Sequence, residues 1–531
     1  MKYTAVALAY SLLSPTTAFQ TGTTTLIIPT TPPSPPKFPL IGTLPDFLLR
    51  GGVSSLSQIY TDMYTEYGPV FSLSLMNREQ LIFSDPRVYD QVFKAEGKYP
   101  IGAAEEVSTF NTFYEKNNLK MALKGVARGE EWKEWRGALE DDMYKSWEGY
   151  IPTIAHVCRQ ISQVAGREDV EFETFLSRAA FDMFTSVMIG ESLQTTDGDV
   201  ATVEDIEFVK ATQAAFDTTG KLLSNPLEAM FGGDLQGEFD VNMEKTYRFA
   251  NRMNKRAAEE ASALQKTVTT ENNSGESSES KCPISAIKSK FASPSFVERL
   301  VHRGKLSNDD IAEIAAPLLM AGVDTTAYVM SWLYLNLASN PEAQTKLAAE
   351  LKTVLNGADI TTKEQMDSLP YLKACIRESH RLTPATPIVV KMLDKDIDMI
   401  VPTTSNDKPN AYHAKAGTRI CLNLRGIPMD PQYVDNPTEY RPERFLPEAI
   451  QARKGTPSEI IDHAAFADPF GRGKRRCLGS NVANAEIMIL AARLFQDWEI
   501  ALKEDNAEWK AAQKLMLKAD PYPAMRLSRR V

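Results

Sequence analysis

The sequence has few cysteines, and their scatter excludes two common uses of this residue. Five occur among 531 residues, and no two of them have the Cys-x-x-Cys spacing of a metal or redox site. A zinc ribbon is therefore excluded, and an odd, scattered set does not suit a disulfide framework. Any chemistry that a cysteine performs here is performed by a single thiol. The five are Cys158, Cys282, Cys375, Cys421 and Cys477.

Positive charge is also in deficit. The chain has 59 lysines and arginines against 69 aspartates and glutamates, a formal net charge of -10. This acidic balance argues against non-specific binding of nucleic acid, which depends on a basic surface. With 43% hydrophobic and 24% charged residues, the composition is that of a globular protein rather than a disordered or polytopic one.

The start of the chain lacks acidic residues before Asp46 and arginine before Arg50. Its first residues, MKYTAVALAYSLLSPTTAFQ, have the form of a signal peptide, with an apolar run too short for a transmembrane helix. The hydroxyl- and proline-rich stretch that follows suits a plastid transit segment, and Phe19 resembles the residue after the cut in two-step plastid signals. We therefore predict a targeting segment with a Pro-rich hinge at residues 1–45. The plastid is favoured, and the mitochondrion or an uncleaved anchor in the endoplasmic reticulum membrane is the alternative.

Residues 46–531 contain no internal repeat and are predicted to form one mainly helical domain. Alternating β-branched residues predict strands in VFSLSLMNREQLIFS, IVVKMLDKDIDMIV and GTRICLNLRGI. Residues 266–281 are polar and of low complexity, and we expect a disordered surface loop there.

One long apolar helix is predicted to begin at Ser307, where Asp310 completes a capping box, and to end at residues 339–341. At about 1.5 Å per residue it is long enough to cross a whole domain. Its apolar middle could suggest a membrane span, but Asp324 lies at its centre. A charge there is costly in lipid, so we expect a buried helix with a polar functional notch.

The stretch FADPFGRGKRRCLGS surrounds Cys477 with cations and glycines. A thiolate is the reactive form of cysteine, and nearby cations, loop amides and the N-terminus of a following helix stabilise it. The glycines Gly471, Gly473 and Gly479 allow the backbone to bend closely around a flat group. An inert buried cysteine after a basic loop is the alternative.

This stretch resembles the haem-binding signature of the cytochrome P450 family, Phe-x-x-Gly-x-Arg-x-Cys-x-Gly, and the resemblance extends over residues 37–531. It implies a mainly α triangular prism with a small β region, and haem b as the cofactor. Cys477 would be the axial ligand of the haem iron, and its thiolate would favour O–O cleavage. The cofactor-binding residues in this loop would be Phe470, Gly471, Arg475 and Gly479.

The stretch AGVDTT in the long helix resembles the oxygen-activation motif of the same family. Ala321 and Gly322 would leave room for dioxygen between the helix and the haem. The hydroxyl of Thr325 can bond back to the carbonyl four residues earlier and open the helix locally. Asp324 beside it would supply the titratable group for proton delivery, so these two residues are the predicted catalytic pair.

Two further motifs match the family. EWKEWR resembles its Trp-x-x-x-Arg, with Trp132 packing at the porphyrin edge and Arg136 neutralising a propionate. Lys391 stands where many members have a propionate-binding arginine, although lysine lacks the bidentate fork. RESHR resembles Glu-x-x-Arg, and the predicted structural trio is Glu378, Arg381 and Arg444.

The resemblance implies a monooxygenase that inserts one atom of O2 into a lipophilic sterol, carotenoid, fatty acid or terpenoid. Lys373 and Arg377 resemble the basic pair with which mitochondrial members dock a ferredoxin, and a flavoprotein reductase is the alternative donor. No nucleic-acid partner is expected, and peripheral membrane association is left open. The alternative functions are a haem-thiolate isomerase or dehydratase acting on peroxides, and a non-enzymatic helical binding protein.

Overall fold

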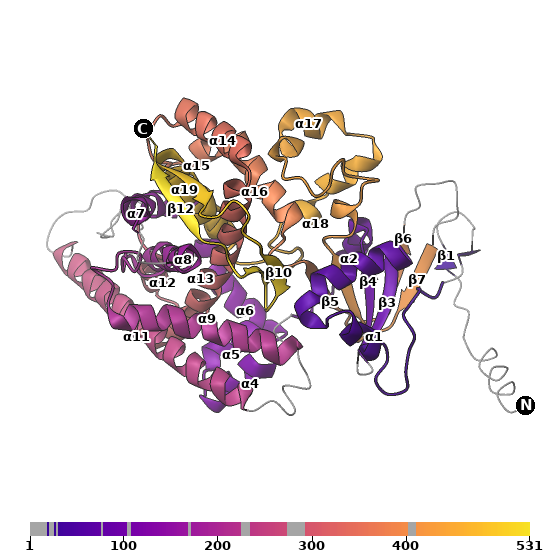
Figure 1. The fold of residues 1–531 in the computed structure, drawn as a ribbon. Helices are drawn as coiled ribbons and strands as arrows, with labels where there is room; N and C mark the ends of the chain where they lie inside the picture. Colours follow the sequence, from indigo (N-terminus) through magenta and orange to yellow (C-terminus); the bar gives the residue numbers. More distant parts are fainter. Residues whose placement is uncertain are drawn as a thin grey trace, which may run out of the picture.

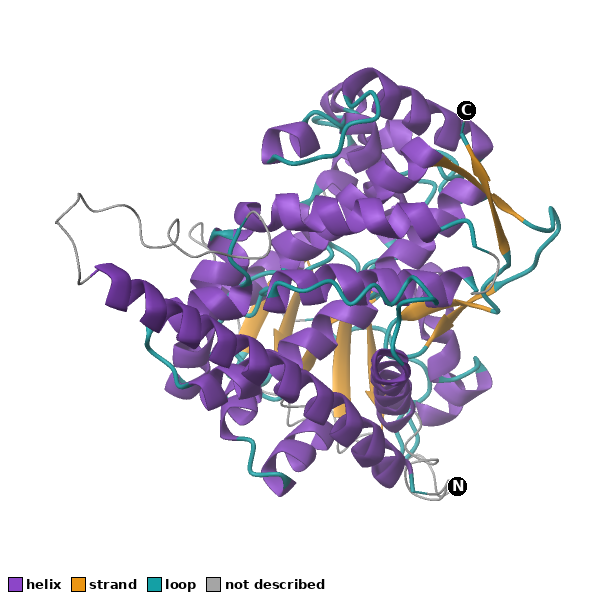
Figure 2. Cartoon of the chain, turned by 90° about the vertical axis from the view of Figure 1, so that its left-hand side faces the viewer, coloured by secondary structure: helices purple, strands orange, loops and turns teal. Residues whose placement is uncertain are grey.

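The computed structural model describes residues 19–20, 26–27, 30–75, 78–102, 108–167, 171–224, 234–272, 293–401 and 410–530. A large helical part and a smaller β part lie side by side, and the C-terminal strands lie with the helices (Figure 1). The predicted fold class, mainly α with a small β region, is confirmed. Seen from the side, the helices stand in front of the four-stranded sheet (Figure 2).

The helices follow one another along most of the chain. They are α1 Leu44–Leu49, α2 Leu56–Tyr67, α3 Pro86–Ala95, α4 Ser108–Lys116, α5 Lys120–Val126, α6 Glu130–Glu140, α7 Ile151–Val164, α8 Phe172–Ile189, α9 Val203–Ser224, α11 Leu235–Asn272, α12 Phe296–Arg303, α13 Asn308–Ala338, α14 Pro341–Val354, α15 Lys363–Asp367, α16 Pro370–Leu382, α17 Pro447–Ala452, α18 Ala464–Ala467 and α19 Ser480–Asp497.

Helix α13 is the predicted long helix, and it forms the axis of the core. Ser307 caps it by accepting from the backbone N–H of Asp310, and Ser339 ends it, as the sequence predicts. The helix continues through Pro317. In the described part of the chain it alone is long and apolar enough to cross a bilayer, but most of that apolar stretch is buried among other helices.

The main sheet has the strand order β3-β4-β8-β5. Its strands β3 Val70–Leu75, β4 Arg78–Phe83, β5 Ile388–Met392 and β8 Arg419–Asn423, and β6 Ile397–Val401 beside it, all fall in the segments predicted as strands. Strand β4 pairs with β8 in parallel, although more than 300 residues separate them, and the other pairs are antiparallel.

Further strands were not predicted from the sequence. They are β1 Phe19–Gln20, β2 Leu26–Ile27, β7 Asn410–Ala414, β9 Trp498–Leu502, β10 Lys510–Gln513, β11 Leu517–Asp520 and β12 Met525–Arg529. The β10–β11 hairpin contacts α13, because the indole N–H of Trp332 donates to the carbonyl of Leu517 at 2.8 Å. Just after the hairpin, the hydroxyl of Tyr522 donates to the carbonyl of Ser331 at 3.0 Å.

Two predicted boundaries need correction. The folded body begins before residue 46, because the backbone N–H of Thr30 donates to Ala411 at 2.8 Å and that of Ser72 donates to Pro33 at 2.8 Å. The first part of the predicted loop 266–281 is helical, because α11 continues to Asn272. Residues 1–18, 21–25, 28–29 and 273–281, on which other parts of these two predictions fall, lie outside the described residues.

Candidate active site

A cavity of about 360 Å³ lies between α13, the loop before α19, and the first turns of α19. The loop and α13 face each other across one space. Six of the predicted site residues line it: Ala321, Gly322, Thr325, Phe470, Cys477 and Gly479. The remaining wall is mainly apolar and comes from Met143, Phe184, Leu318, Val329, Ile487 and Met516.

The loop holds Cys477 at the start of a helix, as the motif predicts. The backbone N–H of Cys477 donates to the carbonyl of Phe470 at 3.0 Å, which closes the loop. Gly471 and Gly473 have φ of 69° and 76°, a left-handed backbone that favours glycine. A Cβ on Gly473 would also lie 2.6 Å from the carboxylate of Glu96. Helix α19 begins at Ser480, directly after the loop.

Opposing effects act on the Cys477 thiol. Its side chain is exposed to the cavity and enclosed by protein on its other sides, and this burial raises the pKa of the thiol. The backbone N–H of Gly479 and the charges of Arg136 and Arg476 lower that pKa, while Asp468 raises it. The cations and the amide therefore act in the direction that the sequence predicts, although burial outweighs them. A metal cation at the sulfur would add a further effect that favours the thiolate.

The opposite wall of the cavity is the notch in α13. The hydroxyl of Thr325 donates to the carbonyl of Ala321 at 2.8 Å, so the predicted back-bond is present. Packing also requires glycine at position 322, which the sequence alone does not reveal. A Cβ at this position would lie 2.5 Å from the ring of Phe184. The glycine therefore lets α13 pack on α8 as well as leaving space in the cavity.

Asp324 is next to Thr325 but is not among the residues that line the cavity. Its side chain is buried, and its Oδ2 has no hydrogen-bond partner. Burial and, to a smaller extent, the negative charge of Asp217 raise the pKa of Asp324 to about 8, and the charge of Lys518 opposes them. The carboxyl is therefore neutral at physiological pH and can act as a proton donor.

The predicted propionate-side residues gather beside the Cys477 loop. The guanidinium of Arg475 lies 4.1 Å from the ring centroid of Trp132, and Nη1 of Arg136 donates to the carbonyl of Arg476 at 2.8 Å. Trp132 and Arg136 both come from α6. Lys391 instead forms an ion pair of 2.7 Å with Glu96, so its charge is already balanced within the chain.

The predicted structural trio forms a buried ion cluster. The carboxylate of Glu378 forms ion pairs with the guanidinium groups of Arg381 at 2.8 Å and Arg444 at 3.2 Å. Each of these side chains is at most 6% exposed. Arg381 also donates to the carbonyls of Pro428 and Pro437. The cluster therefore ties α16 to the segment before the loop.

The predicted docking cations are engaged by acids. Lys373 is half-exposed and pairs with Asp367 at 2.6 Å. Arg377 pairs with Asp462 at 2.8 Å and lies over a phenylalanine ring, so much of its surface is covered. Both residues line a hollow of about 390 Å³ on the face of α16, which Arg476 and Asp468 also line.

Glu486 was missed by the sequence reasoning. It lines the cavity from α19, is 1% exposed, and has no partner for either carboxylate oxygen. Burial raises its pKa well above the usual range of a carboxyl. A lone glutamate within the apolar run of α19 was the signal that could have drawn attention to it.

The cavity fits a flat cofactor held by Cys477. Gly479 has an ordinary φ of -86°, and a Cβ there would meet no protein atom within 4 Å, so the chain itself does not require glycine at this position. The thiol and the small residues of α13 line opposite walls of the same space, and Arg136 supplies a positive charge beside it. These are the donors and the room that haem b needs.

Comparisons with known proteins agree with this geometry. The family model described as "Cytochrome P450" matches residues 32–525. The chain is 22% identical over 489 residues to 1,25-dihydroxyvitamin D(3) 24-hydroxylase, mitochondrial, of Rattus norvegicus, covering 89% of this chain and 84% of that protein. It is 23% identical to sterol 26-hydroxylase, mitochondrial, of Mus musculus (91% and 87% covered) and 24% identical to ferruginol synthase of Salvia fruticosa (90% and 89% covered).

Proposed function

The chain belongs to the cytochrome P450 family, and on this basis we propose that Cys477 is the axial ligand of its haem iron. Members of the family are haem b monooxygenases, and this chain is one. One observation carries the assignment: Cys477 and Thr325 line opposite walls of one cavity, although 152 positions separate them in the sequence. Haem b, when bound, supplies the iron at which dioxygen is activated.

The residues of the chain have distinct tasks in this proposal. The Gly479 amide and the charges of Arg136 and Arg476 stabilise the thiolate form of Cys477. The hydroxyl of Thr325 lies at the cavity wall, where it would donate a proton into the cavity, and the carboxyl of Asp324 would replace that proton. The apolar wall excludes bulk water from the reacting centre.

The substrate is a lipophilic molecule of the sterol or terpenoid class, within the broader range that includes carotenoids and fatty acids. Phe184, Leu318, Val329 and Met516 form an apolar wall over the notch, which suits a hydrocarbon skeleton. The named relatives act on 1,25-dihydroxyvitamin D(3) and on a sterol, and one makes ferruginol. Spectral titration of the purified protein with members of these classes tests the assignment.

The electron donor is a ferredoxin that docks at the hollow on α16. Two of the relatives are mitochondrial enzymes by name, and this supports a ferredoxin and a mitochondrial location over the plastid. Lys373 is the exposed cation of the predicted pair, whereas Arg377 is largely committed to Asp462. Residues 1–45 are proposed to direct import. A reporter fused to them should reach the organelle, and stable insertion in the endoplasmic reticulum would contradict this.

The ferrous carbon monoxide spectrum tests the central proposal. Cys477→Ser should abolish the red-shifted Soret band, because a neutral hydroxyl is a poor iron ligand and gives no electron push. Cys421→Ser, in strand β8 and not among the residues that line the cavity, is the matched control and should keep the band. A red-shifted band in Cys477→Ser would refute the ligand assignment. The peroxide isomerase and the helical binding protein have no support among the named relatives, which are hydroxylases and a synthase.

A further inference from the structure

Helix α9 contains a glycine that its own sequence does not explain. Gly220 is buried, and the helix continues beyond it to Ser224. Glycine is unfavourable inside a helix, because it loses more backbone freedom on folding than any other residue. Alanine would suit the helix better at this position. The packing of α9 against another part of the chain supplies the reason for glycine.

The neighbour of Gly220 is the turn of the β10–β11 hairpin, residues 514–516, which we call the hairpin tip. A Cβ on Gly220 would lie 2.6 Å from the backbone nitrogen of Leu515 and 3.1 Å from the carbonyl carbon of Lys514. Both atoms belong to the backbone, so no flexible side chain could move aside. The tip is a tight turn, because the backbone N–H of Lys514 donates to the carbonyl of Met516 at 3.0 Å. The tip therefore lies directly on α9 (Figure 1).

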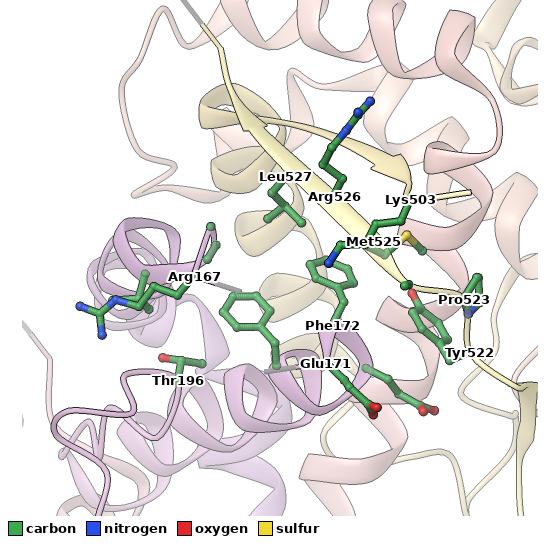
Figure 3. A pocket seen from close by; sticks show the side chains of 16 residues that line it. Arg167, Glu171, Phe172, Thr196, Lys503, Tyr522, Pro523, Met525, Arg526 and Leu527 are labelled. Carbon is green, nitrogen blue, oxygen red and sulfur yellow. The ribbon is translucent and has the colours of Figure 1, made fainter. Parts of the chain in front are cut away.

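The base of the hairpin is held by two other helices. The indole N–H of Trp332 on α13 donates to the carbonyl of Leu517 at 2.8 Å. Nζ of Lys518 lies 3.2 Å from the carboxylate of Glu173 on α8. Just after the hairpin, Tyr522 donates to a carbonyl of α13 at 3.0 Å, and Figure 3 shows it beside a second hollow of about 300 Å³. Because the base is held on α8 and α13, the contact with α9 is what places the tip.

The hairpin tip reaches the active site. Met516 lines the active-site cavity, and it directly follows Leu515, whose backbone nitrogen faces Gly220. Ala385 lines the same cavity, and its carbonyl accepts from the backbone N–H of Leu517 at 2.8 Å. A displacement of the tip would therefore change the cavity wall at a place where an apolar substrate packs.

We propose that Gly220 is a specificity-determining residue of this enzyme, which positions Met516 by allowing the hairpin tip to lie directly on α9. The missing side chain sets the distance between the helix and the tip, and this distance fixes how far Met516 reaches into the cavity. The cavity then accepts lipophilic skeletons of one shape better than others. This role depends on the proposed function, because it concerns the space in which a ligand meets the haem.

Spectral titration of the ferric protein with two iron-binding probes tests this role. Imidazole is small, whereas 1-(biphenyl-4-yl)imidazole has a rigid apolar arm that must pack against the cavity wall. Gly220→Ala adds one carbon between α9 and the tip. It should change the ratio of the two dissociation constants about tenfold, because a misfit of one carbon in an apolar pocket has an effect of this order. Equal ratios in Gly220→Ala and in wild type would refute the role of Gly220.

A double-mutant cycle with Met516→Ala shows whether Gly220 acts through that side chain. Once Met516 is truncated, Gly220→Ala should change the ratio less than about twofold, and an undiminished change would contradict the positioning of Met516. The matched control is Gly137→Ala, because Gly137 also lies inside a helix, α6, but a Cβ there would meet no atom within 4 Å. This control should keep the wild-type ratio and raise the urea midpoint.

Lys514→Met tests the same contact if Gly220→Ala does not fold. It removes the 3.8 Å ion pair between the tip and Asp217 on α9, and adds no atom to the helix. It should change the ratio about twofold, whereas Lys510→Met, at the start of β10, should not. Equal ratios in both lysine variants would refute the role of the contact. A red-shifted carbon monoxide band in the same samples would leave the haem assignment standing, and its absence from wild type would instead contradict the proposed function.

Discussion

Replacing Asp324 by asparagine should change how stability depends on pH. Burial raises the pKa of this carboxyl from 3.8 to about 8, so between these values the folded state holds one more proton than the unfolded state. Stability therefore falls as pH rises through this window, because the carboxyl of the unfolded chain releases its proton to water whereas the folded protein retains it. Asparagine does not titrate, and the variant lacks this loss.

The size of the effect follows from the shift. One pKa unit corresponds to about 1.4 kcal/mol, so the three units between about pH 5 and pH 8 correspond to roughly 4 kcal/mol. The free energy of unfolding of Asp324→Asn, relative to wild type, should rise by about this amount across that interval. Neither Asp217 nor Lys518 is removed by the variant, so their charges remain in place.

Urea unfolding of the ferric protein, at a series of pH values and with circular dichroism as the signal, measures this difference. Asp182→Asn is the matched control, because Asp182 is also buried but receives hydrogen bonds from Thr195 and Thr196, and its pKa is raised only to about 6. Its curve should be parallel to wild type above that value. Parallel curves for Asp324→Asn across the whole range would show an ionised Asp324 and refute its role as a neutral donor.

Three further predictions follow from the same geometry. Thr325→Ala should still bind haem but release more peroxide per electron consumed, and an unchanged ratio of product to electrons would assign the hydroxyl to helix packing alone. Glu378→Gln removes the charge between Arg381 and Arg444 and should lower the free energy of unfolding by about 3–5 kcal/mol, which the urea midpoint reports. Lys373→Ala should slow reduction by ferredoxin at low salt and leave the carbon monoxide spectrum intact, whereas equal rates would place the dock elsewhere.

The haem loop and the long helix were predictable because their signals are local. Ser307 and Asp310 form a capping box within one turn, and the order of residues around Cys477 requires a tight loop before a helix. The back-bond of Thr325 spans a single helical turn, so it too can be read from the chain. Such contacts depend on neighbours a few residues away, and propensity and spacing describe them well.

The partners of charged residues were not predictable in this way. Arg377 reads as a docking cation in the sequence, but Asp462 engages it from a distant segment. The ion cluster of Glu378, Arg381 and Arg444 could be anticipated only because the resemblance to the P450 family pointed to Arg444 as the third member. Sequence order does not specify which of many acids a given cation will meet, since that depends on how distant elements pack.

The sequence by itself determined the loop that holds Cys477, the long helix and the helical class of this protein, because each is encoded in short-range spacing. Only the tertiary structure decided which side of α13 Asp324 occupies and that Glu173 and Lys518 form an ion pair. It also decided that the missing side chain of Gly322 makes room for the ring of Phe184. These contacts join α8, α13 and the C-terminal hairpin, which are more than 100 residues apart along the chain. Their formation depends on the close packing of the whole core, to which no local pattern in the sequence corresponds.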